Sequence, residues 1–351
     1  MSASLVVLLP VILFGIVSLL CFVGCVLNTH GLAPTFTQYS TTTVLGNPAV
    51  VAYWPLNDAN DTLPAADLAS SPDNGQYIDP TTLPAIYPWP DFSIAAAPSP
   101  NIESAAAGFG TMAAAGFGTI AFAQPGIVTG DFGTGGSDSD PSGTSTCLVV
   151  NGCYVNVPLV PKISSLTSFT LEAWVRVDWD KNAPHAWRAV LDARELNPSC
   201  TGFAIIARAD DNAPGVYHWM AVIGNGGTGA AGFTTAIGAD PIPLKDPSMP
   251  AGSSVYLAVT YDGPSQTLTL FVDGLQSGSV VTSAVYVPNT TKPLWIGAGV
   301  PYAPMRPQAA GVIAGPLFPF VGALQDVAIY SKALGSDVIL THLHNGSGFN
   351  P

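Results

Sequence analysis

Short runs of β-forming residues, separated by turn residues, fill the sequence after residue 147, and this pattern limits the fold more than any other feature. Residues 168–178, SFTLEAWVRVD, alternate in polarity as a strand with two different faces does. Comparable runs occur at 187–193, 202–209, 216–224, 254–262, 266–274, 293–299 and 319–330. Many short strands joined by turns predict an all-β fold, an antiparallel two-sheet sandwich of the jelly-roll type.

Turn and helix signals refine this expectation. The run 148–157, LVVNGCYVNV, has an Asn-Gly pair between β-forming residues and predicts a hairpin. A second hairpin is predicted where DGPSQ joins residues 254–262 to residues 266–274. Ser336 can begin a short helix and Gly346 can end it. The 36 glycines and 32 prolines argue against long helices elsewhere in the soluble part.

The N-terminal segment 5–27 is uninterrupted by charge. At about 1.5 Å per residue it is long enough to cross a hydrocarbon core of roughly 30 Å, so we expect a transmembrane helix. A cleaved signal peptide is a second interpretation, although MSAS has no positive charge and no A-x-A site follows. A lipoprotein ending its signal at Cys25 is a third. The composition of the remainder places it outside the cytoplasm, in a periplasmic or extracellular position.

One face of this predicted helix carries small residues, which favour close packing between membrane helices. They are Gly15, Ser18, Cys21, Gly24 and Cys25. The expected partners are therefore the lipid bilayer and other integral membrane proteins. A nucleic-acid partner is excluded because the chain has only 10 Lys and Arg against 23 Asp and Glu, a net charge of −13, and cannot neutralise a row of phosphates.

The chain divides into a tail at 1–4, the helix at 5–27, a polar spacer at 28–48 and one domain at 49–348. An Ala-, Gly- and Pro-rich insertion at about 80–146 interrupts the domain. It contains AAAGFGT twice, at 105–111 and 113–119. Its small apolar residues indicate either self-packing or contact with a partner. Phe109, Phe117 and Phe122 are the expected contact residues.

The soluble part holds three cysteines, Cys147, Cys153 and Cys200. In an oxidising compartment an odd number predicts one disulfide and one free thiol. Cys153–Cys200 and Cys147–Cys153 are both open as pairings, and the spacing does not suit zinc.

The order of these motifs resembles the laminin-G-like, concanavalin A-like lectin/glucanase jelly-roll family. The resemblance covers most of residues 49–348. Its pieces are AYWPLND (52–58), LVVNGCYVNVP (148–158), SLTSFTLEAWVRV (165–177), SVYLAVTYDGPSQTLTLFVDG (254–274), LWIGAG (294–299) and FVGALQDVAIYSKALGSDVI (320–339). It implies two antiparallel sheets, a concave face and extracellular binding, often with calcium at the rim. The insertion, the cysteines and the weak first strand depart from it.

Glu172 is one of three glutamates in the chain and lies next to a tryptophan, which raises the question of glycoside hydrolysis. The resemblance implies a structural strand there, with Glu172 facing outward beside Arg176. Hydrolysis needs two carboxylates aimed at one bond. The E-x-D-x-x-E pattern of related glycosidases is absent, so we expect no enzyme.

Oxygen-rich and aromatic residues suggest binding instead. Asn57, Asp58, Asn60 and Asp61 form a loop that can hold calcium, although turn residues of this kind also occur without a metal. His342 and His344 are expected on an exposed tail. Sugar-stacking candidates, each weighed against a core position, are Trp54, Trp89, Trp187, Trp219, Trp295 and Tyr302. Asn60, Asn289 and Asn345 begin N-x-S/T triplets that accept N-linked glycans.

Together these features predict a membrane-anchored, single-pass, non-catalytic interaction module that serves as a structural or accessory subunit of a membrane assembly. The alternative is a lectin-like glycan-binding protein that uses calcium, with glycans as the partner. A glycoside hydrolase comes third.

Overall fold

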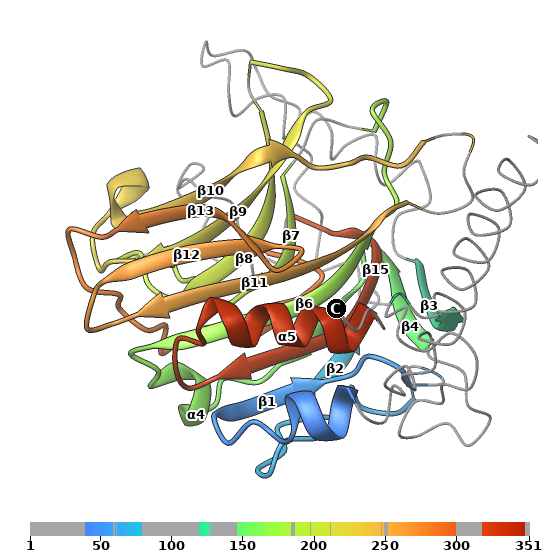
Figure 1. Cartoon of the computed structure of the whole chain (residues 1–351), viewed down its shortest axis with the longest axis horizontal. Helices are drawn as coiled ribbons and strands as arrows, with labels where there is room; N and C mark the ends of the chain where they lie inside the picture. Colours follow the sequence, from blue (N-terminus) through green and yellow to red (C-terminus); the bar gives the residue numbers. More distant parts are fainter. Residues whose placement is uncertain are drawn as a thin grey trace, which may run out of the picture.

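The computed structural model describes residues 39–58, 60, 62–78, 119–125, 127, 146–183, 187–196, 198–210, 212–246, 248, 252–299 and 318–347. These residues form two antiparallel sheets packed as a sandwich (Figure 1). The all-β, two-sheet prediction is confirmed.

The eight-stranded sheet has the order β13-β12-β11-β6-β15-β4-β3, and β1 also pairs with β15. Its strands are β1 (Val50–Trp54), β3 (Thr119–Pro125), β4 (Thr146–Asn151), β6 (Phe169–Val177), β11 (Ser254–Asp262), β12 (Thr267–Val272), β13 (Leu275–Val281) and β15 (Val321–Tyr330). The seven-stranded sheet has the order β10-β9-β8-β7-β14-β5-β2. Its strands are β2 (Gln76–Ile78), β5 (Tyr154–Val157), β7 (Arg188–Asp192), β8 (Phe203–Ala209), β9 (Tyr217–Gly224), β10 (Phe233–Pro241) and β14 (Leu294–Ile296).

The main core lies between the sheets, where alternate residues of each strand meet. Leu171, Ala173 and Val175 of β6 face Ile205 and Ala221 of the opposite sheet's strands, and all are fully buried. The alternation of period two read from the sequence therefore identifies the inward residues correctly. Burial of this apolar surface drives the two sheets together.

A second apolar layer covers the outer face of the eight-stranded sheet. Helix α5 (Ser336–Ser347) and the π-helix η1 (Tyr39–Val44) lie over β6, β11, β15 and β1 (Figure 1). Tyr39 and Val44 are buried in this layer. Residues 39–44 of the predicted spacer at 28–48 thus form η1, whose Tyr39 and Val44 pack against the sheet.

A β-bulge divides β15 into two parts, which pair with two different strands along the same edge. Residues 321–324 pair with β4 and residues 327–330 pair with β1. The register shifts between Gln325 and Ala328, and Asp326 there has a φ of 52°. Its Oδ1 accepts the hydroxyl of Tyr53 at 2.5 Å. The bulge turns a polar side chain into the layer beneath η1.

One sequence-based expectation about strand pairing is wrong. Residues 148–157 do not form a hairpin, because β4 belongs to the eight-stranded sheet and β5 to the seven-stranded one. Gly152, with a φ of 88°, lets the chain cross between them. Within the predicted insertion at about 80–146, β3 pairs with β4 of the eight-stranded sheet.

The predicted disulfide is absent. Cys147, Cys153 and Cys200 are buried and form no disulfide with one another. Cys153 lies in the main core, Cys200 packs on the outer side of the seven-stranded sheet, and Cys147 lies in the layer beneath η1 and α5. The three thiols therefore occupy three different layers.

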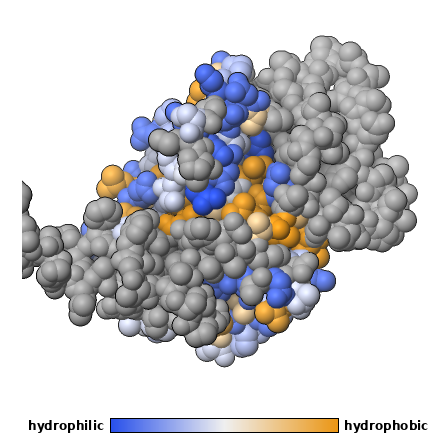
Figure 2. Space-filling model, turned by 90° about the vertical axis from the view of Figure 1, so that its right-hand side faces the viewer, coloured by the Kyte–Doolittle hydropathy of each residue, from blue (hydrophilic) through white to orange (hydrophobic). Residues whose placement is uncertain are grey.

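Several predictions concern residues outside the described ones. The helix-packing residues of segment 5–27, and Phe109 and Phe117, are among them, while Phe122 is in β3. Within the described residues no helix has the length and apolar character needed to cross a membrane. On the side viewed in Figure 2, apolar residues form a band between hydrophilic areas.

Candidate functional site

A row of side chains crosses the outer face of the seven-stranded sheet. In the ladder Asp192 pairs with Trp295, Trp295 with Asn156, and Asn156 with Gln76. Directly opposed residues share a face of a sheet. The neighbours Leu294, Ile296, Val155 and Val157 all point into the main core. The row therefore lies on the outer face, where Gln76 is exposed and Trp295 and Asn156 are half-buried.

Two side chains, Asn156 and Tyr154, contact the indole of Trp295. Its Nε1 donates a hydrogen bond to Asn156 Oδ1 at 3.0 Å. Tyr154, two residues before Asn156 and on the same face, meets the indole edge-on with ring centroids 6.2 Å apart and planes at 71°. A ring fixed in this way loses little side-chain freedom when a ligand stacks on it.

Asp192, at the buried end of the row, forms an ion pair with Arg194. Arg194 Nε donates to Asp192 Oδ1 at 2.9 Å and its terminal nitrogen donates to Oδ2 at 2.6 Å, with both side chains fully buried. The guanidinium lies 5.6 Å from the ring of Phe233. This bidentate pair engages both oxygens of Asp192, so the carboxylate serves structure rather than acid–base chemistry.

The other predicted aromatic platforms have different positions. Trp54 and Trp219 are buried in the main core. Trp187 is half-buried at another part of the seven-stranded sheet, where it meets Phe318 and the guanidinium of Arg208. Trp89 and Tyr302 lie outside the described residues. Among the described tryptophans that were expected to bind sugars, Trp295 stands next to side-chain amides on the same face.

Glu172 lies on the outer face of its sheet, as predicted, but beneath α5 and fully buried, so the expectation of an exposed position beside Arg176 is wrong. Its Oε2 accepts the hydroxyl of Tyr330 at 2.9 Å, and Oε1 lies 2.9 Å from His342 Nδ1. Arg176 pairs with Asp178 instead. His342 is likewise buried rather than part of an exposed tail. This carboxylate fastens the helix to the sheet.

Burial alone would lower the pKa of His342 by penalising its charged form. The Glu172 carboxylate and its hydrogen bond act in the opposite direction and raise that pKa above its usual value. Burial, together with the charge of Glu172, holds the pKa of Tyr330 and Tyr256 well above the usual range. The tyrosines are therefore neutral.

The loop predicted to hold calcium is organised by internal hydrogen bonds. Asp58 Oδ2 accepts the hydroxyl of Tyr77 at 2.6 Å, and burial raises the pKa of Asp58. Asn60 Oδ1 accepts the backbone N–H of Thr62 at 3.0 Å. Asn57 is likewise engaged by a neighbouring group. Asp61 lies outside the described residues. Calcium binding there stays a prediction.

A carboxylate that the sequence did not single out organises the rest of this loop. Asp67 is buried and accepts the backbone N–H groups of Tyr53, Ala69 and Asp73. Lys162 Nζ lies 2.7 Å from its Oδ2 and 2.9 Å from Asp73 Oδ2. Spacing along the chain does not reveal this cluster, because Lys162 comes from the short helix α4 (Pro161–Ser164) far downstream.

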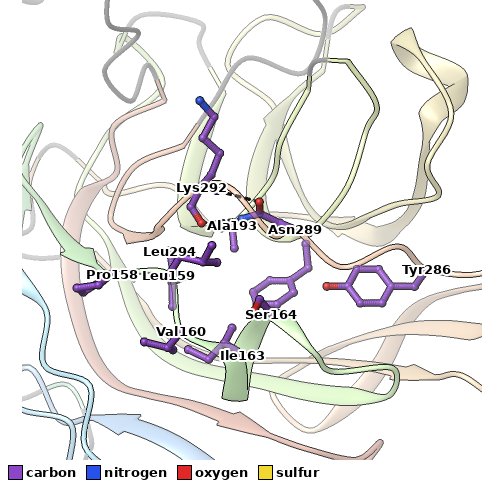
Figure 3. A pocket seen from close by; sticks show the side chains of 11 residues that line it. Pro158, Leu159, Val160, Ile163, Ser164, Ala193, Tyr286, Asn289, Lys292 and Leu294 are labelled. Carbon is purple, nitrogen blue, oxygen red and sulfur yellow. Dashed lines mark hydrogen bonds between the residues drawn. The ribbon is translucent and has the colours of Figure 1, made fainter.

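A small pocket opens at one end of the sandwich, between α4 and the segment before β14 (Figure 3). Leu159, Val160, Ile163 and Leu294 give it an apolar lining, while the Lys292 side chain extends away from it. Its volume of about 10 Å³ is room for about one water molecule. A sugar ring does not fit there, so the outer face around Trp295 is the better candidate.

Asn156 and Gln76 are members of the row that sequence reasoning missed. Gln76 lies on the three-residue strand β2, which is too short to show an alternating pattern. Asn156 was read as part of a hairpin with β4. Only the pairing of β5 with β14 brings it against Trp295.

Solved structures resemble the chain only distantly. The botulinum neurotoxin serotype C1 binding domain is 9% identical over 85% of this chain and 52% of that chain, with a TM-score of 0.45. The binding domain of Paraclostridial Mosquitocidal Protein 1 is 14% identical over 57% and 43%, with a TM-score of 0.38. The CBM40 of Ruminococcus gnavus IT-sialidase is 14% identical over 50% and 82%, with a TM-score of 0.35. The chain thus spans only about half, or less, of the two toxin domains, and likenesses this weak say nothing about function.

The sequence itself assigns the family. No curated protein matches the chain. The model of the concanavalin A-like lectin/glucanases superfamily matches residues 151–340, more than half of the 351 residues. The match includes β5 to β15, and therefore Trp295, Asn156 and the Asp192–Arg194 pair. The chain belongs to the concanavalin A-like lectin/glucanases superfamily.

Proposed function

We propose that this protein is a non-catalytic glycan-binding module, and that the outer face of the seven-stranded sheet around Trp295 is its binding site. The observation that carries the proposal is the half-buried indole of Trp295, fixed by Asn156 and Tyr154 beside the exposed Gln76. Family membership alone would not suffice, because one fold serves many functions.

The chemistry of the row suits a pyranose ring. The C–H face of a sugar is apolar and stacks on an aromatic ring, while its hydroxyl groups need amide partners around the rim. Trp295 offers the ring, Asn156 on the adjacent strand β5 places a side-chain amide next to it, and Gln76 on β2 adds a second amide one strand further along the row. Because the indole N–H is engaged by Asn156, the ring face rather than its edge is the part available to a ligand.

The proposed ligand is neutral. The charged pair nearest in the row, Asp192 and Arg194, is fully buried and mutually neutralised. The whole chain has only 10 Lys and Arg, so it is poorly equipped to attract acidic sugars. Stacking and amide hydrogen bonds, rather than charge, would then select the glycan.

The proposed location is outside the cytoplasm, with residues 5–27 as a single membrane anchor. The support is the length and the uncharged, apolar character of that segment. Packing of this segment against other membrane proteins through Gly15, Ser18 and Gly24 belongs to the same proposal. Protease protection of the full-length protein in sealed vesicles tests the orientation.

The proposal predicts the effect of removing the ring. The full-length protein in detergent is screened against a glycan array, and the best neutral glycan is titrated by calorimetry. Trp295→Ala is expected to raise the Kd about tenfold or more, because an aromatic contact contributes about 0.5–1.5 kcal/mol beyond its buried area. Trp295→Phe should retain part of the affinity.

Trp187→Ala is the matched control, since Trp187 is also a half-buried tryptophan on a strand boundary of the same sheet. It should fold and bind as the parent protein does. Equal binding by the parent and Trp295→Ala, with a native unfolding transition in both, refutes the proposed site. Repeating the titration with a calcium chelator shows whether residues 57–61 contribute a metal.

A further inference from the structure

Three triplets in the chain have the form that N-linked glycosylation requires. They are Asn60-Asp61-Thr62, Asn289-Thr290-Thr291 and Asn345-Gly346-Ser347. The sequence does not distinguish among them. The structure does, because the three asparagine side chains differ in exposure and in what their amide nitrogens bind.

Asn289 is built into the fold. It is 4% exposed, and its amide nitrogen donates to the carbonyl oxygen of Lys292 at 2.7 Å. Its Oδ1 accepts the backbone N–H groups of Thr291 and Lys292, both at 2.9 Å. Figure 3 shows the bond to Lys292 beside the small pocket. A sugar on this nitrogen would break the turn and has no space to leave the protein.

Asn345 is also engaged. It lies in α5, is half-buried, and its amide nitrogen donates to Thr43 Oγ1 on η1 at 2.8 Å. The next residue, Gly346, packs so closely on Trp174 that an added Cβ would lie 2.5 Å from the indole. A glycan at Asn345 would separate α5 from η1 and open the layer over the eight-stranded sheet.

Asn60 differs in both respects. It is exposed, on the loop between β1 and β2. Its Oδ1 accepts both the backbone N–H and the hydroxyl of Thr62, so the first and third residues of the triplet are already in contact. Both bonds use the oxygen of the carboxamide and leave its nitrogen directed elsewhere.

We propose that Asn60 is an N-glycosylation site, and that the folded protein carries its N-linked oligosaccharide there and not on Asn289 or Asn345. The co-reactant is an oligosaccharide linked to a polyprenyl diphosphate. The amide nitrogen of Asn60 forms a bond to C1 of the first sugar and loses a proton to a base. The C1–O bond to the diphosphate breaks, and the polyprenyl diphosphate leaves with the electron pair.

This proposal rests on the location outside the cytoplasm, and not on glycan binding at Trp295. The full-length chain is expressed in a mammalian cell line and recovered, folded, from the membrane and secreted fractions. Peptide-N-glycosidase in ¹⁸O-water converts each glycosylated asparagine to a labelled aspartate, which mass spectrometry locates. The expected result is label on Asn60 alone.

Three matched variants each remove the hydroxyl group of the third residue of one triplet and leave all three asparagines in place. Thr62→Ala should abolish the mass added by the glycan, whereas Thr291→Ala and Ser347→Ala should leave it unchanged. An unlabelled Asn60, or label on Asn289 or Asn345 in folded protein, overturns the proposal. The sugar-binding proposal is judged separately, because Trp295→Ala should lose its ligand and keep the Asn60 glycan.

Discussion

Glu172 and His342 form a buried pair whose charge depends on pH. The side chains are 1% and 5% exposed, and Tyr330 donates a further hydrogen bond to the carboxylate. The partner groups that face this pair from β11, β15 and η1 are Tyr256, Tyr330 and Tyr39, with pKa values raised by burial. They stay neutral when His342 titrates.

The raised pKa of His342 fixes the sign of a stability change. Because the folded protein binds this proton more tightly than the unfolded chain, the contribution is fully present below about pH 6.5 and is lost as the pH rises through the folded value. Each tenfold difference in proton affinity corresponds to about 1.4 kcal/mol. Urea unfolding of the parent protein from pH 5.5 to pH 9 should show this loss.

His342→Gln is the matched control, because glutamine can still donate to Glu172 but carries no charge. As the pH rises, the free energy of unfolding of His342→Gln should fall less than that of the parent protein. Parallel pH dependences of the parent and this variant would show that folding does not raise the pKa of His342.

Strand β6 shows how far the sequence alone reaches. Its alternation correctly predicts the strand and the inward residues Leu171, Ala173 and Val175. The opposite face was read as solvent-exposed, as is usual for an antiparallel sheet with one solvated side. That assumption fails because α5 and η1 cover this face, so Thr170, Glu172 and Trp174 are buried as well. Local periodicity carries no information about a third layer.

The candidate site was predictable only in part, for a similar reason. Trp295 was identified as an aromatic candidate from residue type. Its partner Asn156 comes from β5, and the Asn-Gly pair before β5 predicts a hairpin that the structure does not form. Strand order between sheets depends on packing across the whole sandwich. For that reason no local pattern could place Asn156 and Gln76 beside Trp295.

Docking of α5 on the sheet predicts a specific packing defect. In Gly346→Ala the new methyl group would lie 2.5 Å from Trp174 Cζ2. Overpacking of this kind costs about 1–3 kcal/mol, more than alanine contributes through helix propensity. Thermal unfolding should show a lower Tm than in the parent protein.

Thr341→Ala, on the exposed side of the same helix, is the comparison. Its Tm should change little. If Gly346→Ala and Thr341→Ala both have the Tm of the parent protein, Gly346 does not contact the indole in solution.

At the scale of the whole molecule, the fold is held without a disulfide among the described residues. Burial raises the pKa of Cys147 to about 12 and also raises that of Cys200. Cys147, Cys153 and Cys200 should therefore resist alkylation in the native protein and react in urea. Peptide mapping by mass spectrometry distinguishes alkylation of these three cysteines from alkylation of Cys21 and Cys25. A reductant should leave the Tm unchanged, and a linked pair of peptides from these three cysteines would contradict the structure.

The pairing of β1 with β15 has a consequence for synthesis of the protein. Tyr53 and Asp326 are 273 residues apart in sequence, and Thr43 and Asn345 are 302 apart. Chains emerge from the ribosome at about 5–20 residues per second, and contacts between distant residues slow folding. β1 and η1 are therefore synthesised early and cannot make these contacts until nearly all of the described chain has been made. A chaperone that shields exposed β1 should raise the yield of folded protein more than one acting on the β11–β12 hairpin.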